Sequence, residues 1–191
     1  MEASLKSYPQ EPPLTIDPAR RYFAVIRTSA GNIRLQLLPA EAPRAVNSFV
    51  FLAREGFYNG LTFYRVLPDF IAQAGDPSCD AQDRFACRGS GGPGYILPLE
   101  PGGPPHASGT VAMAAIASSA NVSGSQFYIA QADLPGQAGK DTVFARVVEG
   151  MQVVESLSLR NPCFGPATAQ SDCEPDPPPG TEILSVTIEE L

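Results

Sequence analysis

Residues 62–76, TFYRVLPDFIAQAGD, contain two short apolar runs divided by a turn signal. Two runs rich in apolar residues, Thr62–Leu67 and Phe70–Gly75, each have the length of a short β-strand. Pro68 and Asp69 lie between them, and both residue types favour turns. The stretch therefore predicts two antiparallel strands that pair about Asp69.

This pairing would bring an unusual set of side chains together on one face. Arg65 would stand opposite Gln73, and Leu67 would face Ile71. Because side chains alternate along a strand, Phe63 would share their face, and the core side would hold Tyr64, Val66, Ala72 and Ala74. A face that mixes a guanidinium and an amide with apolar groups suits a ligand that is part apolar ring and part peptide. The alternative is that Arg65 is a surface charge paired with a carboxylate, which is common and contributes little to stability.

Short apolar runs separated by turn signals continue along most of the chain. The first two, Tyr22–Ser29 and residues 32–37, form a predicted hairpin. A helix should begin at Pro43, because apolar residues follow it at helical spacing as far as Gly56. Further elements are expected as strands at Thr110–Ala115, Gln126–Gln131, Val143–Val148 and residues 184–188, and as a short helix at Met151–Leu157. About eight short strands and two helices predict a mainly β protein, either a sandwich or a closed barrel whose ends the helices cap.

The length of the chain, 191 residues, suits a single domain. Residues 1–19 contain four prolines and little apolar periodicity. They predict a flexible N-terminal tether, ahead of a folded domain over residues 20–191. We expect a monomer.

The charge of the chain limits its partners. The formal net charge is −7, from 13 basic and 20 acidic residues. Proteins that bind nucleic acid usually carry a basic surface, so neither nucleic acid nor an anionic membrane surface is an expected partner. No apolar run approaches the roughly 18 residues of a membrane-spanning helix, so membrane insertion is not expected.

The four cysteines form two close pairs in sequence, Cys79 with Cys87 and Cys163 with Cys173. Both pairs lie in polar segments rich in Pro and Gly, and neither has the spacing of a zinc site. Four cysteines allow three connectivities, and we favour a disulfide within each close pair, because short loops would otherwise carry four exposed thiols. Disulfides imply an oxidising compartment, so an extracytoplasmic location (periplasmic, cell-surface or secreted) is expected. Free thiols in the cytoplasm are the alternative.

Five segments carry a resemblance to a known family. FYRVLPDFIAQAGD at residues 63–76 is similar to the cyclophilin pattern F-[HY]-R-[VI]-[IL]-P-x-F-x-x-Q-x-G-D. GGPGY at residues 91–95 resembles the glycine-rich loop of that family, and GTVAMA at 109–114, GSQFYI at 124–129 and VFARV at 143–147 resemble its later strands. The matches occur in the family's order and span roughly residues 22–155. The chain therefore resembles the cyclophilin-type peptidyl-prolyl isomerases.

The resemblance implies an eight-stranded antiparallel β-barrel capped by two α-helices, with a shallow proline-binding groove on its outer face. It implies an isomerase that acts on Xaa-Pro bonds of proline-containing polypeptides and assists their folding, without a covalent intermediate, metal or cofactor. Arg65 would be the catalytic arginine, and Gln73 would orient it and bind substrate backbone. The proline pocket would be formed by Phe70, Ile71, Met113, Tyr128 and Leu134. The residues before the proline would bind Gln126 and the main chain of Ala114 and Ala115. A proline-peptide-binding module with little turnover is the alternative.

Three positions depart from this pattern. The chain has no Trp, and Leu134 stands at the far wall of the groove, where the family often has an aromatic residue. Asp141 and Ala115 stand where the family often has His and Asn. Simple alternation places Phe70 on the core side, whereas the resemblance places it at the pocket, and a bend at Pro68-Asp69 could reconcile the two. The single histidine, His106, is expected to be structural.

Overall fold

The computed structural model describes residues 7–81, 87, 89–116, 119–163 and 173–191. Ten strands, two α-helices and one short 3-10 helix follow one another along these residues. In chain order they are β1 (Tyr22–Thr28), β2 (Gly31–Leu37), α1 (Pro43–Arg54), β3 (Thr62–Phe63), β4 (Arg65–Leu67), β5 (Ile71–Ala74), β6 (Ile96–Pro98), β7 (Thr110–Ala115), β8 (Asn121–Ala130), the 3-10 helix (Pro135–Gln137), β9 (Thr142–Glu149), α2 (Met151–Glu155) and β10 (Thr181–Glu190).

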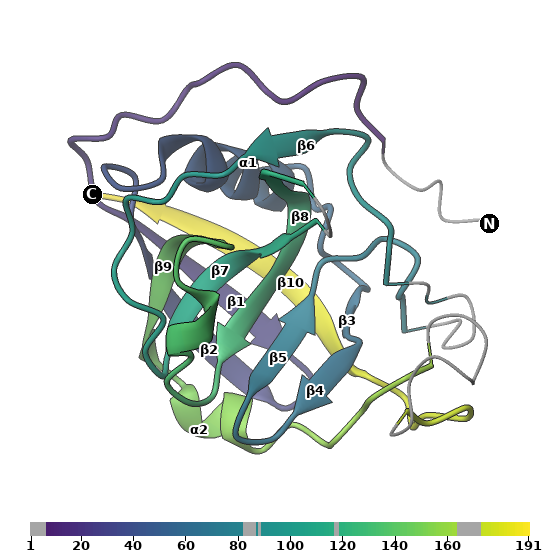
Figure 1. The fold of residues 1–191 in the computed structure, drawn as a ribbon. Coiled ribbons are helices and arrows are strands. Elements are labelled where there is room, and N and C mark those ends of the chain that lie inside the picture. Colours follow the sequence, from purple (N-terminus) through teal and green to yellow (C-terminus); the bar gives the residue numbers. More distant parts are fainter. Residues whose placement is uncertain (1–6, 82–86, 88, 117–118, 164–172) are drawn as a thin grey trace.

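The strands form one antiparallel sheet that curves into a nearly closed barrel. Its order is β3-β10-β1-β2-β9-β7-β8-β5-β4, and β6 pairs separately with β8. Only Tyr64 separates β3 from β4, so the two ends of this order are joined by one residue of chain. With β3 and β4 counted as one strand and β6 set aside, the barrel has the eight strands that were predicted. Figure 1 shows α1 and α2 at opposite ends of the barrel, and the predicted fold is confirmed.

The barrel interior is a packed apolar core. The ring of Phe49 on α1 contacts the rings of Tyr58, Phe127 and Phe144. The helix itself has no side-chain cap of its own at Ala42. Instead the carboxylate of Glu100 accepts hydrogen bonds from two main-chain N–H groups of its first turn. A carboxylate at this end of a helix also stabilises the helix dipole.

Tyr64 interrupts the alternation of side chains between β3 and β4. Phe63, which was expected on the same face as Arg65, is fully buried in the core and contacts the Phe127 ring. Tyr64 was expected on the core side, but its hydroxyl donates to the side chain of Gln126. The extra residue lets the chain put Phe63 inside and still place Arg65 outside, as a β-bulge does. That part of the predicted face was therefore wrong.

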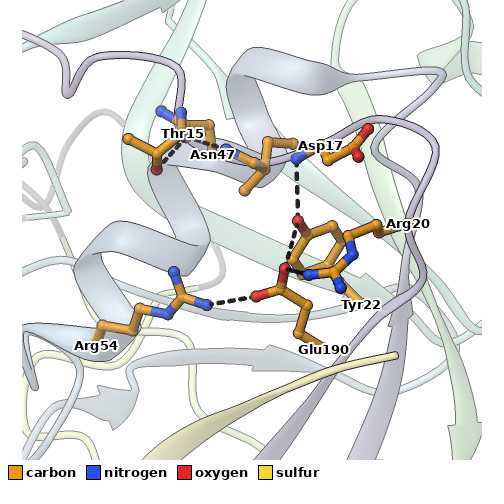
Figure 2. Close-up of polar contacts among 8 residues, drawn as sticks. Thr15, Asp17, Arg20, Tyr22, Asn47, Arg54 and Glu190 are labelled. Carbon is orange, nitrogen blue, oxygen red and sulfur yellow. Dashed lines mark hydrogen bonds and ion pairs between the residues drawn. The ribbon is translucent and has the colours of Figure 1, made fainter.

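Residues 7–19 follow the outside of α1, in the region for which the sequence predicted a tether. Figure 2 shows Thr15 against Asn47 of α1. The Asn47 side-chain oxygen accepts from the main-chain N–H of Thr15 and of Ile16, at 2.9 and 3.4 Å. The Asn47 amide nitrogen donates to the carbonyls of Pro12 and Pro13 at 3.3 and 3.0 Å. We call residues 7–19 the arm. Residues 1–6 lie outside the described residues.

Tyr22 links the arm to the C-terminal strand. The hydroxyl of Tyr22 accepts from the N–H of Asp17 and donates to Glu190 of β10. Glu190 forms ion pairs with Arg20 and with Arg54, the last residue of α1 (Figure 2). The first strand, the last strand and α1 are thus joined at one place.

Both predicted disulfides are present. Cys79 is bonded to Cys87, and Cys163 to Cys173. Two disulfides are consistent with an oxidising, extracytoplasmic location. Among the described residues, no helix has the length and apolar character needed to cross a membrane.

Candidate active site

Four side chains form a row across the outer face of the barrel. Arg65 of β4 pairs with Gln73 of β5, as the sequence predicted. Gln73 pairs with Tyr128 of β8, and Tyr128 pairs with Ala112 of β7. Neighbouring strands lie about 4.8 Å apart, so Arg65 and Tyr128 stand about 10 Å apart along the row. We call these four residues the outer row.

An apolar cluster adjoins the outer row. Its buried members come from four strands and the loop after β8, and they are Ile71, Ala112, Tyr128, Ala130, Leu134 and Val143. We call them the outer cluster. Phe70 packs against it, in agreement with the resemblance and not with simple alternation. The reason is the turn at Asp69, whose φ of 58° redirects the chain before β5 begins at Ile71. Phe70, Ile71, Tyr128 and Leu134 are therefore brought together, beside Ala114.

Met113 lies elsewhere. It is fully buried in the barrel core, among the side chains that face inward. Its neighbours in β7, Ala112 and Ala114, belong to or pack against the outer cluster, as alternation along a strand requires. Met113 is thus separated from the other residues assigned to the proline pocket.

Arg65 is half-buried, and its guanidinium makes no hydrogen bond or ion pair with any described residue. An ordinary surface arginine on a strand would be expected to lie in solvent or against a carboxylate. The alternative interpretation, in which Arg65 is held by an acidic partner, therefore finds no partner within the described chain. Its donors remain available to a ligand beside the outer cluster.

Gln73 and Gln126 form a hydrogen-bonded unit next to Arg65. The Gln126 side-chain oxygen accepts from Gln73 Nε2 at 3.0 Å and from the hydroxyl of Tyr64 at 2.5 Å. Gln126 Nε2 donates to the carbonyl of Gly91 at 2.7 Å. Both ends of the Gln126 amide are thus used within the protein. Gln73 is bonded to Gln126, and no hydrogen bond joins it to Arg65 within the described residues.

A groove of about 830 Å³ runs beside this unit. Its walls include Gln73, Gly91, Gly94, Tyr95, Ala114 and Gln126. Asp76, which is fully buried, fixes the glycine-rich side, because its carboxylate accepts from the N–H of Gly91 at 2.8 Å. A side chain at Gly91 would displace this carboxylate, since a Cβ there would lie 2.2 Å from Asp76 Oδ1. The groove could hold an extended peptide leading to the outer cluster.

Tyr128 and Asp141 are hydrogen-bonded at the back of the outer cluster. The Tyr128 hydroxyl donates to Asp141 Oδ2 at 2.8 Å, and the N–H of Ala115 donates to Asp141 Oδ1 at 2.7 Å. Burial raises the pKa of Tyr128 above its ordinary value, and the neighbouring carboxylate raises it further. The main-chain N–H of Ala115, which was expected to bind substrate, therefore already has an acceptor.

Sequence reasoning missed Tyr64 and Asp76 as parts of the site. Both lie inside the motif that was recognised, but Tyr64 was assigned to the core by alternation and Asp76 was given no role. The run of glycines from residue 89 was the available signal for Asp76, because a glycine-rich loop needs a fixed acceptor for its N–H groups. Among the described residues, no group of three His, Cys, Asp or Glu side chains could hold a metal ion.

Comparison with known proteins identifies the family of this chain. The profile of the family described as "Cyclophilin type peptidyl-prolyl cis-trans isomerase/CLD" matches residues 23–186. A peptidyl-prolyl cis-trans isomerase of Helicobacter pylori is 40% identical over 143 residues, which are 73% of this chain and 82% of that protein. One of Synechococcus elongatus is 41% identical over 138 residues, or 72% of this chain and 88% of that protein.

A solved structure agrees with the fold. The Cryptosporidium parvum cyclophilin type peptidyl-prolyl cis-trans isomerase superposes with a TM-score of 0.70 at 23% identity, covering 88% of this chain and 98% of its own. At that identity the likeness supports the barrel alone. The matching profile covers most of the chain, and the relatives above are matched over more than four-fifths of their length. The chain therefore belongs to the cyclophilin family of peptidyl-prolyl cis-trans isomerases.

Proposed function

We propose that this chain accelerates cis–trans isomerisation of Xaa-Pro bonds in polypeptides, with Arg65 stabilising the twisted amide and the outer cluster holding the proline ring. The observation that carries the proposal is Arg65 itself, which is half-buried in the same row as Tyr128 and whose guanidinium has no partner among the described residues. Met113 has no part in it, because its side chain faces the barrel core.

The chemistry needs a donor and a pocket. A peptide bond resists rotation by about 18–20 kcal/mol because rotation breaks amide resonance. In the twisted state the prolyl nitrogen regains a lone pair, so a donor near that nitrogen stabilises this state more than either planar isomer. Arginine suits the task, because it stays charged and presents several donors in a fixed plane. No covalent bond is broken, so the mechanism needs neither a nucleophile nor a cofactor.

Arg65 cannot supply the whole acceleration. Raising a rate from about 10⁻² to about 10³ per second lowers the barrier by about 7 kcal/mol. A hydrogen bond to a charged group contributes about 1.5–3 kcal/mol. The outer cluster must contribute through holding the proline ring while the preceding carbonyl turns. Gln73 must contribute through binding substrate backbone with its side-chain oxygen, which bonds to no described residue. The residues before the proline would lie in the groove beside Gln126 and Ala114.

The setting we propose is extracytoplasmic protein folding. The two disulfides support an oxidising compartment. Polypeptides that fold there contain Xaa-Pro bonds whose isomerisation takes tens to hundreds of seconds unaided. The natural substrates would be proline-containing segments of such chains, bound by a monomer.

Arg65→Ala tests the role of the guanidinium. We expect kcat/KM for a short Xaa-Pro peptide to fall about 10- to 150-fold, which corresponds to one charge-assisted hydrogen bond. Magnetisation exchange between the cis and trans peptide signals measures the rate without a coupling protease. Arg27→Ala is the matched control, because Arg27 is an exposed strand arginine on β1. It should leave the rate unchanged.

The same experiment separates catalysis from binding alone. If wild type and Arg65→Ala bind a proline peptide and neither accelerates exchange, the chain is a binding module and the proposal fails. If both accelerate exchange equally, the assignment of Arg65 fails.

A further inference from the structure

We propose that Asp141 is a positioning residue for the proline-binding site, holding the Tyr128 ring and the end of β7 in the arrangement that receives the proline ring. This inference rests on the proposed function of the outer cluster. Asp141 immediately precedes β9 and is 6% exposed. Its two carboxylate oxygens accept from two different strands, Oδ2 from the Tyr128 hydroxyl of β8 and Oδ1 from the Ala115 N–H of β7.

The carboxylate depends on these two bonds. Within the described residues Asp141 forms no ion pair with Lys or Arg. Its titratable neighbours are Tyr128 and His106, and burial lowers the pKa of His106 below its ordinary value, which disfavours a compensating positive charge there. A buried carboxylate without a cation must be satisfied by hydrogen bonds, or burial becomes strongly unfavourable. The Asp141 carboxylate therefore favours the arrangement in which the Tyr128 hydroxyl and the Ala115 N–H both bond to it.

Both donors to Asp141 belong to the candidate site. Tyr128 belongs to both the outer row and the outer cluster, so a bond at the end of its ring fixes the surface that the proline would contact. Ala115 follows Ala114, which lines the groove. Without Asp141, the Tyr128 hydroxyl and the Ala115 N–H would both lose their acceptor, and the ring and the strand end could move separately. Side chains that hold a binding residue in this way decide whether the site is preorganised.

Two substitutions separate position from charge. Asp141→Asn keeps one acceptor for Ala115 N–H and an amide that can bond the Tyr128 oxygen, so KM for a short Xaa-Pro peptide should stay within about 2-fold of wild type. Asp141→Ala removes both bonds, and KM should rise about 3- to 10-fold with kcat within about 2-fold, since a lost hydrogen bond of ordinary strength acts on binding of ground and transition states alike. Glu189→Ala is the matched control, because it removes a carboxylate that is bonded within the barrel, to Arg34, and is in contact with neither the groove nor the outer cluster.

Tyr128→Phe completes a double-mutant cycle. If Asp141 acts through Tyr128, the double variant Asp141→Ala with Tyr128→Phe should raise KM by less than the product of the two single effects. Near-ultraviolet circular dichroism and the midpoint of thermal unfolding check that each variant is folded. The same double-mutant cycle can be measured without turnover, from the peptide Kd of each variant in a chemical-shift titration.

Three results would overturn the inference. Folded Asp141→Ala with wild-type KM and Kd would remove the positioning role. Asp141→Asn as impaired as Asp141→Ala would assign the effect to charge. Multiplicative single effects would show that Asp141 does not act through Tyr128. Failure of the proposed function would give a different result. Wild type would then not accelerate exchange, whereas the order of the peptide Kd values would still decide the role of Asp141.

Discussion

Two charged side chains at the candidate site, Arg65 and Asp141, differ in their hydrogen-bond partners. Arg65 is half-buried and its guanidinium has no partner among the described residues, whereas both oxygens of Asp141 are bonded within the protein. Without a partner in the described chain, the Arg65 charge forms no ion pair that would stabilise the fold. Stability does account for Asp141. Arg65, which has no partner in the described part of the chain, is the residue whose donors the proposed mechanism uses.

His106 should make the stability of the protein depend on pH near neutrality. It is the only histidine in the chain, and burial lowers its pKa from the ordinary value of 6.5. The folded state therefore prefers the neutral imidazole, and the unfolded state binds a proton more readily. The free energy of unfolding should be fully retained above pH 6.5 and should fall as the pH drops through the pKa of the folded state.

Urea unfolding between about pH 5 and pH 7.5 measures this dependence, and the single imidazole proton signal gives the pKa directly. His106→Asn should flatten the slope over that interval, because Asp and Glu titrate mostly below it. A wild-type protein whose stability rises on acidification, or a slope that His106→Asn leaves unchanged, would contradict the prediction.

The sequence predicted the strand pairing at the candidate site correctly where the alternation of side chains was regular. Arg65 opposite Gln73 follows from the turn at Asp69 alone, and the structure has this pairing. Met113 was assigned to the pocket from resemblance, although alternation with Ala112 and Ala114 already placed it on the other face. Asp141 was noticed only as a departure from the family, because its two partners lie on strands far from it in sequence.

At the scale of elements, the break at Tyr64 could not be found from the sequence. Phe63 and Tyr64 are both large and aromatic, so the pattern is the same whichever of them faces the core. Long-range strand pairing determines which of the two faces the core, because β3 pairs with β10 while β4 pairs with β5. The short strand β6 was missed for a similar reason. Its three residues, Ile96–Pro98, carry no alternation that distinguishes them from loop, and they are ordered by pairing with β8.

The two disulfides should differ in their effect on the site. Cys79–Cys87 closes a loop with a sequence separation of 8, and Cys163–Cys173 one of 10, so each should stabilise the fold by about 2.5 kcal/mol through the unfolded chain. Cys79 is also bonded through its N–H to the carbonyl of Asp76, the residue whose carboxylate holds Gly91. Replacing both cysteines of this pair by Ala should therefore lower stability and also raise KM.

The Cys163–Cys173 pair provides the matched control, since its neighbours Pro162 and Glu174 pair with each other outside the groove. Its double Ala variant should lose similar stability in urea unfolding but keep the wild-type KM. Equal changes in KM for the two double variants would show that the first disulfide has no specific link to the groove.

At the scale of the whole molecule, the arm connects the α1 end of the barrel with the groove. The N–H of Tyr8 donates to the carbonyl of Pro93 at 2.7 Å, and the Tyr8 ring packs on Phe51 of α1 with 5.0 Å between centroids. Gly94 has a φ of +97°, and a Cβ there would lie 2.4 Å from the Tyr8 carbonyl oxygen. Because Gly94 and Tyr95 line the groove, the arm supports one of its walls from behind.

Asn47→Ala should release the arm and thereby weaken both stability and binding. Asn47 is 4% exposed, and its amide bonds main-chain groups at Pro12, Pro13, Thr15 and Ile16. Losing these bonds should cost about 1–3 kcal/mol of unfolding free energy. Proteolysis within residues 7–16 should become faster, because cleavage follows the population of the detached arm. KM for an Xaa-Pro peptide should rise with little change in kcat, since the wall at Gly94 loses its support while Arg65 is untouched.

Asn32→Ala controls for the loss of an asparagine, because Asn32 is exposed on β2, away from the arm. It should change neither proteolysis nor KM. Asn47→Ala has two expected consequences, faster proteolysis of the arm and a higher KM, which need not occur together. If the arm is cleaved faster and KM stays at the wild-type value, the arm stabilises α1 but does not support the groove. If both change in proportion, the contact between Tyr8 and Pro93 carries the effect of the arm to the peptide site, and the folded unit includes residues that the sequence alone assigns to a tether.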